Sequence, residues 1–140
     1  MIAVDTSVLV DLLGGDARAD AAEACLRLAL GQGPVVACAV VVSELTAGLG
    51  HGAEVMDALE EMGLAYSVID QRSAVRAGEM QRKYRQSLHS AADSDDPFRS
   101  IPDFLVGAHA MLQCQGLITR DSGFFRDYFK GLKVIVPKAG

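Results

Sequence analysis

Short runs of apolar and β-branched residues alternate along this chain with longer segments of helical periodicity. The short runs, each expected to form a buried strand, are Ile2–Val4, Val35–Ala37, Ala65–Ile69, Leu117–Thr119 and Lys133–Val136. The longer segments, each expected to form a helix, are Asp16–Leu30, Val40–Leu49, Ala53–Met62, Gln71–Leu88, Asp103–Gln113 and Gly123–Phe129. Strands separated by helices need crossover connections, which produce a mostly parallel sheet with helices on both faces. The pattern therefore predicts an α/β fold, a three-layer α/β/α sandwich with a mostly parallel central sheet.

The length and the cysteines restrict the class of protein. A chain of 140 residues can bury one hydrophobic core, so we expect a single domain over residues 1–140. Cys25, Cys38 and Cys114 are odd in number, widely spaced and set among apolar neighbours, which is typical of reduced cytoplasmic thiols. The longest uncharged apolar run, Val35–Val42, is far shorter than the roughly 20 residues that span a bilayer. We therefore expect a cytoplasmic protein without a membrane partner.

Four acidic residues fall where the carboxyl ends of the predicted strands should meet. Asp5 follows the first strand, and Glu44 lies in the opening turns of the helix after the second. Asp103 begins the helix that leads into the fourth strand, and Asp121 follows that strand. Ligands of open parallel sheets bind at this edge, and clustered carboxylates without His or Cys favour Mg²⁺ or Mn²⁺. Such a site suits hydrolysis of phosphodiester bonds by a metal-activated water.

The net charge of −5 argues against a general nucleic-acid coat protein, which would normally be basic. Carboxylates that hold metal change this balance, because setting the four proposed ligands aside leaves about −1. The acidity of the chain is therefore compatible with an RNA substrate.

Each of these acids also has a purely structural interpretation. Asp5 could cap a short helix that starts at Ser7, and Asp121 could cap the last predicted helix. Asp103 could complete a capping box with Ser100, and Glu44 could be an exposed helix position. None of the four acids alone distinguishes a metal ligand from a structural residue. The prediction of a metal site therefore depends on all four lying at the same edge of the sheet.

Other polar residues near these positions could assist the site. Thr6 and Ser7 can hydrogen-bond a carboxylate or a metal-bound water, although Ser7 could instead cap a helix. Arg99 and Arg120 flank proposed acids and could contact RNA phosphates, and Arg120 is the favoured one of the two. Asp11 is left outside the site as a solvated or ion-paired helix position.

The sequence resembles a PIN-domain ribonuclease of the VapC toxin type over nearly its whole length. The segments that carry the resemblance, in order, are Val4–Asp11, Ser43–Leu49, Ile101–Ala110 and Leu117–Phe125. The resemblance implies a PIN-like nuclease domain and an endoribonuclease that uses Mg²⁺ or Mn²⁺. The residues that match the metal-binding acids of the family are Asp5, Glu44, Asp103 and Asp121. Thr119 and the small polar residue after Asp5 match groups that support those acids.

The resemblance also implies partners. PIN-domain toxins cut single-stranded regions of RNA, commonly form homodimers, and are held inactive by a small antitoxin that lays a helix and an extended tail across the toxin. Val8–Leu13 and Val40–Leu49 are more apolar than a small core needs. They could form a groove for such a partner, or they could be ordinary core. An RNA substrate, a cognate antitoxin and a homodimer are the expected partners.

The sequence departs from the family pattern in two places. The polar segment Ser90–Ser100, with Asp93, Asp95 and Asp96, is long and acidic; we expect a solvated surface loop, although it could add a ligand. Ser122 follows Asp121 where family members often carry another acid, so the number of ions stays open.

Two other functions remain open at this stage. A catalytically silent PIN-like module would only bind a partner, and the presence of all four acids counts against it. A receiver-like signalling domain would use Asp70 after the third strand as its phosphoacceptor. That class needs an acidic pair at the end of the first strand, where Thr6 and Ser7 stand instead.

Overall fold

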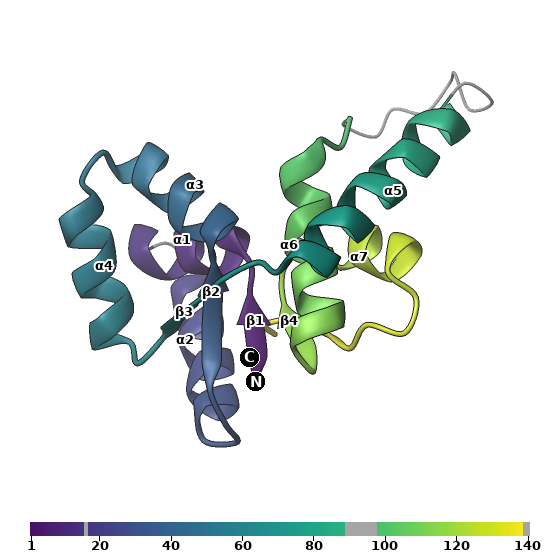
Figure 1. Ribbon diagram of the computed structural model, residues 1–140. Helices are drawn as coiled ribbons and strands as arrows, with labels where there is room; N and C mark the ends of the chain where they lie inside the picture. The colour runs from purple at the N-terminus through teal and green to yellow at the C-terminus, as the bar shows by residue number, and fades with distance from the viewer. Residues whose placement is uncertain (16, 89–97, 139–140) are drawn as a thin grey trace.

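The computed structural model describes residues 1–15, 17–88 and 98–138, and its centre is one parallel sheet (Figure 1). The five strands are β1 (Ile2–Val4), β2 (Val35–Cys38), β3 (Ala65–Ser67), β4 (Gly116–Ile118) and β5 (Val134–Ile135). Their order is β3-β2-β1-β4-β5, and every neighbouring pair is parallel. The predicted α/β fold with a parallel sheet is therefore confirmed.

The order of the strands reverses at β1. The chain continues from β1 to β2 and β3 on one side, and β4 and β5 lie on the other. In open parallel sheets such a reversal leaves a crevice beyond the carboxyl ends of the central strands, and ligands bind there. The carboxyl ends of β1 and β4 meet at this point.

The described helices pack around the sheet. They are α1 (Thr6–Gly14), α2 (Ala19–Leu30), α3 (Ala39–Leu49), α4 (Gly52–Glu61), α5 (Gln71–Leu88), α6 (Ile101–Gln113) and α7 (Ser122–Tyr128). In Figure 1, α5, α6 and α7 group on one side of the view, and α1, α3 and α4 on the other. None of the helices in the described ranges combines the length and the apolar character needed to cross a membrane.

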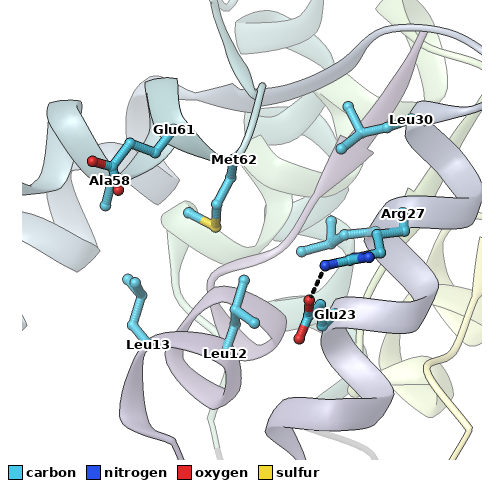
Figure 2. Close-up of a pocket in the computed structure, with 9 residues that line it drawn as sticks. Leu12, Leu13, Glu23, Arg27, Leu30, Ala58, Glu61 and Met62 are labelled. Carbon is cyan, nitrogen blue, oxygen red and sulfur yellow. Dashed lines mark hydrogen bonds and ion pairs between the residues drawn. The ribbon is translucent and has the colours of Figure 1, made fainter.

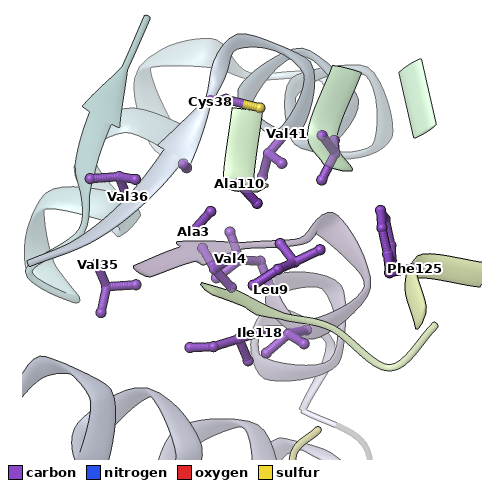
Figure 3. Close-up of a cluster of buried hydrophobic side chains, with 14 of the residues drawn as sticks. Ala3, Val4, Leu9, Val35, Val36, Cys38, Val41, Ala110, Ile118 and Phe125 are labelled. Carbon is purple, nitrogen blue, oxygen red and sulfur yellow. The ribbon is translucent and has the colours of Figure 1, made fainter. Parts of the chain in front are cut away.

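The core forms where the central strands contact helices on both of their faces. All four residues of β2 and all three of β4 are buried. Figure 3 shows part of this core, with side chains such as Val4, Leu9 and Ile118 between the strands and the helices above and below them. Burying one such side chain fully contributes about 1.5–3 kcal/mol. The continuous apolar runs of the sequence are therefore explained by burial on two faces.

The prediction of a buried third strand was wrong. Ala65 and Tyr66 are exposed, and β3 ends at Ser67 rather than at Ile69. The reason is its position, because β3 lies at the edge of the sheet and pairs with β2 alone. Of the acidic segment expected to be a solvated loop, only residues 98–100 lie within the described part of the chain.

His109 of α6 is fully buried and contacts the edge strand. Its Nε2 lies 2.8 Å from Ser67 Oγ, whereas its Nδ1 has no hydrogen-bond partner among the described residues. Burial lowers the pKa of the imidazole, and the charge of Asp70 opposes this effect. The histidine is therefore a packed core residue that is neutral at pH 7.

This histidine should make stability depend on pH. A folded-state pKa below the unfolded value of about 6.5 means that its contribution is complete above that pH and is lost as the pH falls. Urea unfolding at pH 7.5 and pH 5.5 should show a larger loss of unfolding free energy for the wild type than for His109→Gln. Equal losses in both proteins would assign the pH dependence to other groups.

Candidate active site

Asp5 is the first residue after β1 and the N-cap of α1, where its backbone is extended. Its Oδ1 accepts a hydrogen bond from the Thr6 N–H at 2.9 Å. Its Oδ2 accepts from Ser7 Oγ at 3.0 Å and from Thr119 Oγ1 at 2.7 Å. Burial raises the pKa of the carboxyl; these hydrogen bonds lower it, and the charge of Glu44 raises it further. Asp5 thus caps a helix and also presents a half-buried carboxylate whose three donors are all neutral.

Thr119 joins the ends of the two central strands. Asp5 N–H donates to the carbonyl of Ile118 at 2.9 Å, which places the residue after β1 beside the residue after β4. The buried Thr119 Oγ1 donates to Asp5 and accepts from the Asp121 N–H at 3.0 Å. One hydroxyl therefore links the first and the last of the four acids.

Glu44 reaches the same edge from α3. Its Oε1 accepts a hydrogen bond from Thr6 Oγ1 at 2.8 Å, and Thr6 is also the residue whose N–H contacts Asp5. Glu44 itself is exposed. Thr6 therefore connects the carboxylates of Asp5 and Glu44 through its backbone N–H and its hydroxyl.

Asp103 lies in the first turn of α6 and is half-buried. Its N–H donates to the carbonyl of Ser100 at 3.2 Å, but Ser100 makes no side-chain capping hydrogen bond. Burial raises the pKa of Asp103, the charge of Arg99 lowers it, and the charges of Glu44 and Asp121 raise it. The capping box suggested by the sequence is therefore not formed, and Asp103 lies within electrostatic range of two other acids.

Asp121 stands at the N-cap of α7 but makes no side-chain capping bond there. Its carboxylate instead forms an ion pair with Arg99. Asp121 therefore does not cap α7 through its side chain, as the structural interpretation suggested, but pairs with the guanidinium of Arg99. Sequence analysis missed this pair; its available signal was the position of Arg99 just before α6, at the same edge of the sheet.

Arg120, the favoured candidate for contact with RNA, has a different partner. Its Nε lies 2.5 Å from Oδ2 of Asp11, and Asp11 is only 3% exposed. The sequence left Asp11 as either a solvated or an ion-paired helix position, and the structure shows that it is ion-paired. The Arg120 backbone N–H donates to Ser7 Oγ at 3.2 Å. In this structure Arg120 therefore fastens the end of β4 to α1.

Cys38 is a neighbour of Asp5 that the sequence did not suggest. It ends β2, as Val4 ends β1, and is buried. Burial raises the pKa of the thiol, and the negative charge of Asp5 adds to this rise. The protonated thiol is a poor ligand for a hard cation, so oxygen remains the donor type of the site.

The four predicted acids therefore lie at one edge and influence one another electrostatically, but they do not form a closed cage. Among the residues that the structure describes, no three acidic, histidine or cysteine side chains are grouped closely enough to hold an ion. Mg²⁺ commonly retains several waters and binds through one or two carboxylates together with substrate phosphates. The oxygen donors around Asp5 fit a hydrated ion of this kind.

Comparison with known proteins gives a family and a fold. The family model described as PIN domain matches residues 2–130. VapBC2 from Rickettsia felis, solved with a DNA fragment from its promoter, superposes with a TM-score of 0.72 at 18% identity and covers 99% of this chain and 100% of that one. A toxin-antitoxin complex from Klebsiella pneumoniae gives 0.63 at 21%, covering 99% and 98%. VapBC-1 from nontypeable Haemophilus influenzae gives 0.65 at 18%, covering 96% of each chain. No curated protein matches the sequence.

Proposed function

Since the chain belongs to the PIN domain family, we propose that it is a metal-dependent endoribonuclease that hydrolyses RNA phosphodiester bonds. One observation carries this proposal: Asp5, at the reversal point of the sheet, has a half-buried carboxylate with neutral donors only. The charge of Glu44 acts on Asp5, and the charges of Glu44 and Asp121 act on Asp103. Ionising such a group among like charges is unfavourable unless a cation is bound.

Asp5, Glu44, Asp103 and Asp121 are the residues that would hold Mg²⁺ or Mn²⁺, directly or through water. The bound ion would supply a more acidic water as nucleophile and would stabilise the leaving oxygen. Thr119 and Ser7 fix the orientation of the Asp5 carboxylate, and Thr6 does the same for Glu44. The hydroxyls therefore keep the carboxylates in place before a substrate arrives.

We further propose that a small antitoxin inhibits the enzyme, since several similar structures are toxin-antitoxin complexes. A pocket of about 390 Å³ lies between α1, α2 and α4, and its lining is mostly apolar with Glu23, Arg27 and Glu61 among it. Figure 2 shows this lining, including Leu12 and Leu13 of α1 and Met62, which directly follows α4. A second, smaller pocket between α1 and α3 also contains Leu13, together with Glu44. A partner helix seated over Leu13 would therefore extend towards one of the proposed metal ligands.

The receiver-like alternative is not retained, because the family is that of PIN domains and Asp70 has a structural role. Its Oδ1 accepts a hydrogen bond from the Ser73 N–H at 2.8 Å at the start of α5. A catalytically silent PIN-like module would differ from the proposed ribonuclease in one measurable property: it would not cleave RNA. A cytoplasmic location and a homodimer remain predictions.

The proposed activity can be tested with purified protein and a fluorogenic single-stranded RNA. Cleavage should require Mg²⁺ or Mn²⁺, should stop in EDTA, and should fall at least about 100-fold in Asp103→Asn protein that still folds. The cognate antitoxin should inhibit the wild type, and Leu13→Glu protein should cleave normally but escape inhibition. RNA cleavage that is unchanged in Asp103→Asn would refute the assignment, and no cleavage with either ion would favour the silent module.

A further inference from the structure

Arg99 is held in place by contacts that do not involve the acids. Its N–H donates to the hydroxyl of Tyr84 at 2.9 Å, and its carbonyl accepts from Gln81 Nε2 at 3.5 Å. Its guanidinium carbon lies 4.6 Å from the centre of the Phe124 ring, a cation–π contact. Tyr84 in turn packs against Phe104 of α6. The backbone and the guanidinium of Arg99 are therefore both anchored on an aromatic platform.

The same guanidinium makes a two-pronged contact with Asp121. Nη1 pairs with Oδ2, and Nη2 donates to Oδ1 at 3.1 Å. The two side chains are 22% and 36% exposed, so solvent screens the pair only in part. Asp121 is thus engaged by a monovalent cation at a position where the proposed function requires a divalent one.

We propose that Arg99 is a substrate-binding residue that exchanges Asp121 for an RNA phosphate when a divalent ion binds the acids. The inference rests on the proposed function. A divalent ion competes with the guanidinium for Asp121, because both are cations and the ion carries twice the charge. The contacts with Phe124 and Tyr84 do not need Asp121, so they keep the released guanidinium at the edge of the site.

The geometry of the Arg99 guanidinium is suited to binding an RNA phosphate. Its planar fork of parallel N–H donors binds a phosphate as readily as a carboxylate, which an ammonium cannot reproduce. A phosphate next to the scissile bond would lie close to the metal and therefore close to Asp121. Arg99 would then add a charge-assisted contact to the substrate.

The first test measures metal binding without RNA. Mn²⁺ is titrated into wild-type, Arg99→Gln and Arg126→Gln protein, and free Mn²⁺ is followed by electron paramagnetic resonance. Arg126 is exposed on α7, so its variant removes the same charge without touching the pair with Asp121. Arg99→Gln should bind Mn²⁺ about threefold to tenfold more tightly than both other proteins, because a competitor of moderate strength is lost.

The second test measures RNA cleavage at saturating Mn²⁺ in the same proteins and in Arg99→Lys. Arg99→Gln should raise KM for the RNA about tenfold with a smaller change in kcat, as expected for the loss of a charge-assisted hydrogen bond to substrate. Arg99→Lys should give an intermediate KM, and Arg126→Gln should resemble the wild type.

The proposal requires tighter Mn²⁺ binding together with a higher KM. If Arg99→Gln matches Arg126→Gln in either measurement, the exchange does not occur and the proposal is overturned. If the wild type cleaves RNA but Arg99→Gln behaves like Arg126→Gln, the result contradicts the exchange of Arg99 between Asp121 and phosphate and leaves the proposed ribonuclease function standing. A wild type that cleaves no RNA with either ion contradicts the proposed function, whereas the Mn²⁺ titration still reports whether Arg99 competes for Asp121.

Discussion

Asp5→Asn protein is expected to lose RNA cleavage at least about 100-fold and yet, without metal, to unfold at a higher temperature than the wild type. Burial and the charge of Glu44 make the ionised Asp5 unfavourable in the folded protein. Asparagine removes that charge, and its Oδ1 can still accept from the Thr6 N–H. The hydroxyls of Ser7 and Thr119 can rotate to accept from the new amide. The ionised carboxylate of Asp5 should therefore lower the stability of the metal-free protein.

The pH dependence of this difference follows from the raised pKa. Below the unfolded value of about 3.8 the wild-type carboxyl is protonated in both states, and no stability is lost through its charge. As the pH rises from the unfolded pKa to the higher folded pKa, ionisation of the carboxyl lowers the free energy of unfolding, and the loss is complete above the folded pKa. Melting temperatures measured in EDTA from pH 3.5 to 7.5 should therefore show an advantage of Asp5→Asn that grows with pH and then stays constant.

Two controls make this result interpretable. Asp20→Asn makes the same chemical change in the first turn of α2, far along the chain from the site, and should not raise the melting temperature. Mn²⁺ should stabilise the wild type but not Asp5→Asn, because only the wild type keeps the carboxylate ligand. An Asp5→Asn protein that melts below the wild type throughout this range would contradict the account of an uncompensated buried charge.

Gly107→Ala should destabilise the protein severely, although alanine is the better helix former. A Cβ at Gly107 in α6 would lie 2.3, 2.4 and 2.7 Å from three ring carbons of Phe129. Phe129 is 1% exposed and packs against Phe104, Phe124 and Phe125, so the ring has little room to move. Overpacking a core costs about 1–3 kcal/mol, and a contact this close between the added Cβ and a buried ring should reach the upper end of that range or prevent folding.

The matched control is Gly78→Ala in α5, where an added Cβ meets no atom within 4 Å. That change should stabilise the protein by about 0.5–1 kcal/mol, because alanine loses less backbone entropy in a helix. Chemical unfolding of both variants gives the comparison. Adding Phe129→Leu to Gly107→Ala should recover part of the loss. A Gly107→Ala protein as stable as the wild type would show that α6 and α7 can separate without cost.

The sequence contained much of the fold because burial on two faces produces a recognisable pattern. Continuous apolar runs mark β2 and β4, and parallel connection brings Asp5 and Thr119 to one edge. The order of the strands is not encoded in periodicity, since β3 was expected to be buried like the other strands but lies exposed at the margin of the sheet. Whether a strand lies at the edge of a sheet depends on which other strands pair with it, and no local sequence pattern specifies that pairing.

The site was less accessible to prediction, and the two arginines show why. Arg120 is adjacent to Asp121 in sequence, yet its side chain turns to Asp11 of α1. Arg99 is 22 positions from Asp121 and forms the ion pair. Which arginine meets which acid depends on side-chain direction at the ends of three elements, whereas the sequence specifies only that all of them lie at the same edge.

Anomalous diffraction from crystals soaked in Mn²⁺ would locate a divalent ion bound beside Asp5. We expect a manganese peak within about 2–2.5 Å of an Asp5 carboxylate oxygen, with Glu44, Asp103 or Asp121 contacting the ion or its waters. This peak should be absent from Asp5→Asn crystals. Wild-type crystals that show no manganese at this edge, at a Mn²⁺ concentration that supports RNA cleavage in solution, would show that the proposed ion site is wrong.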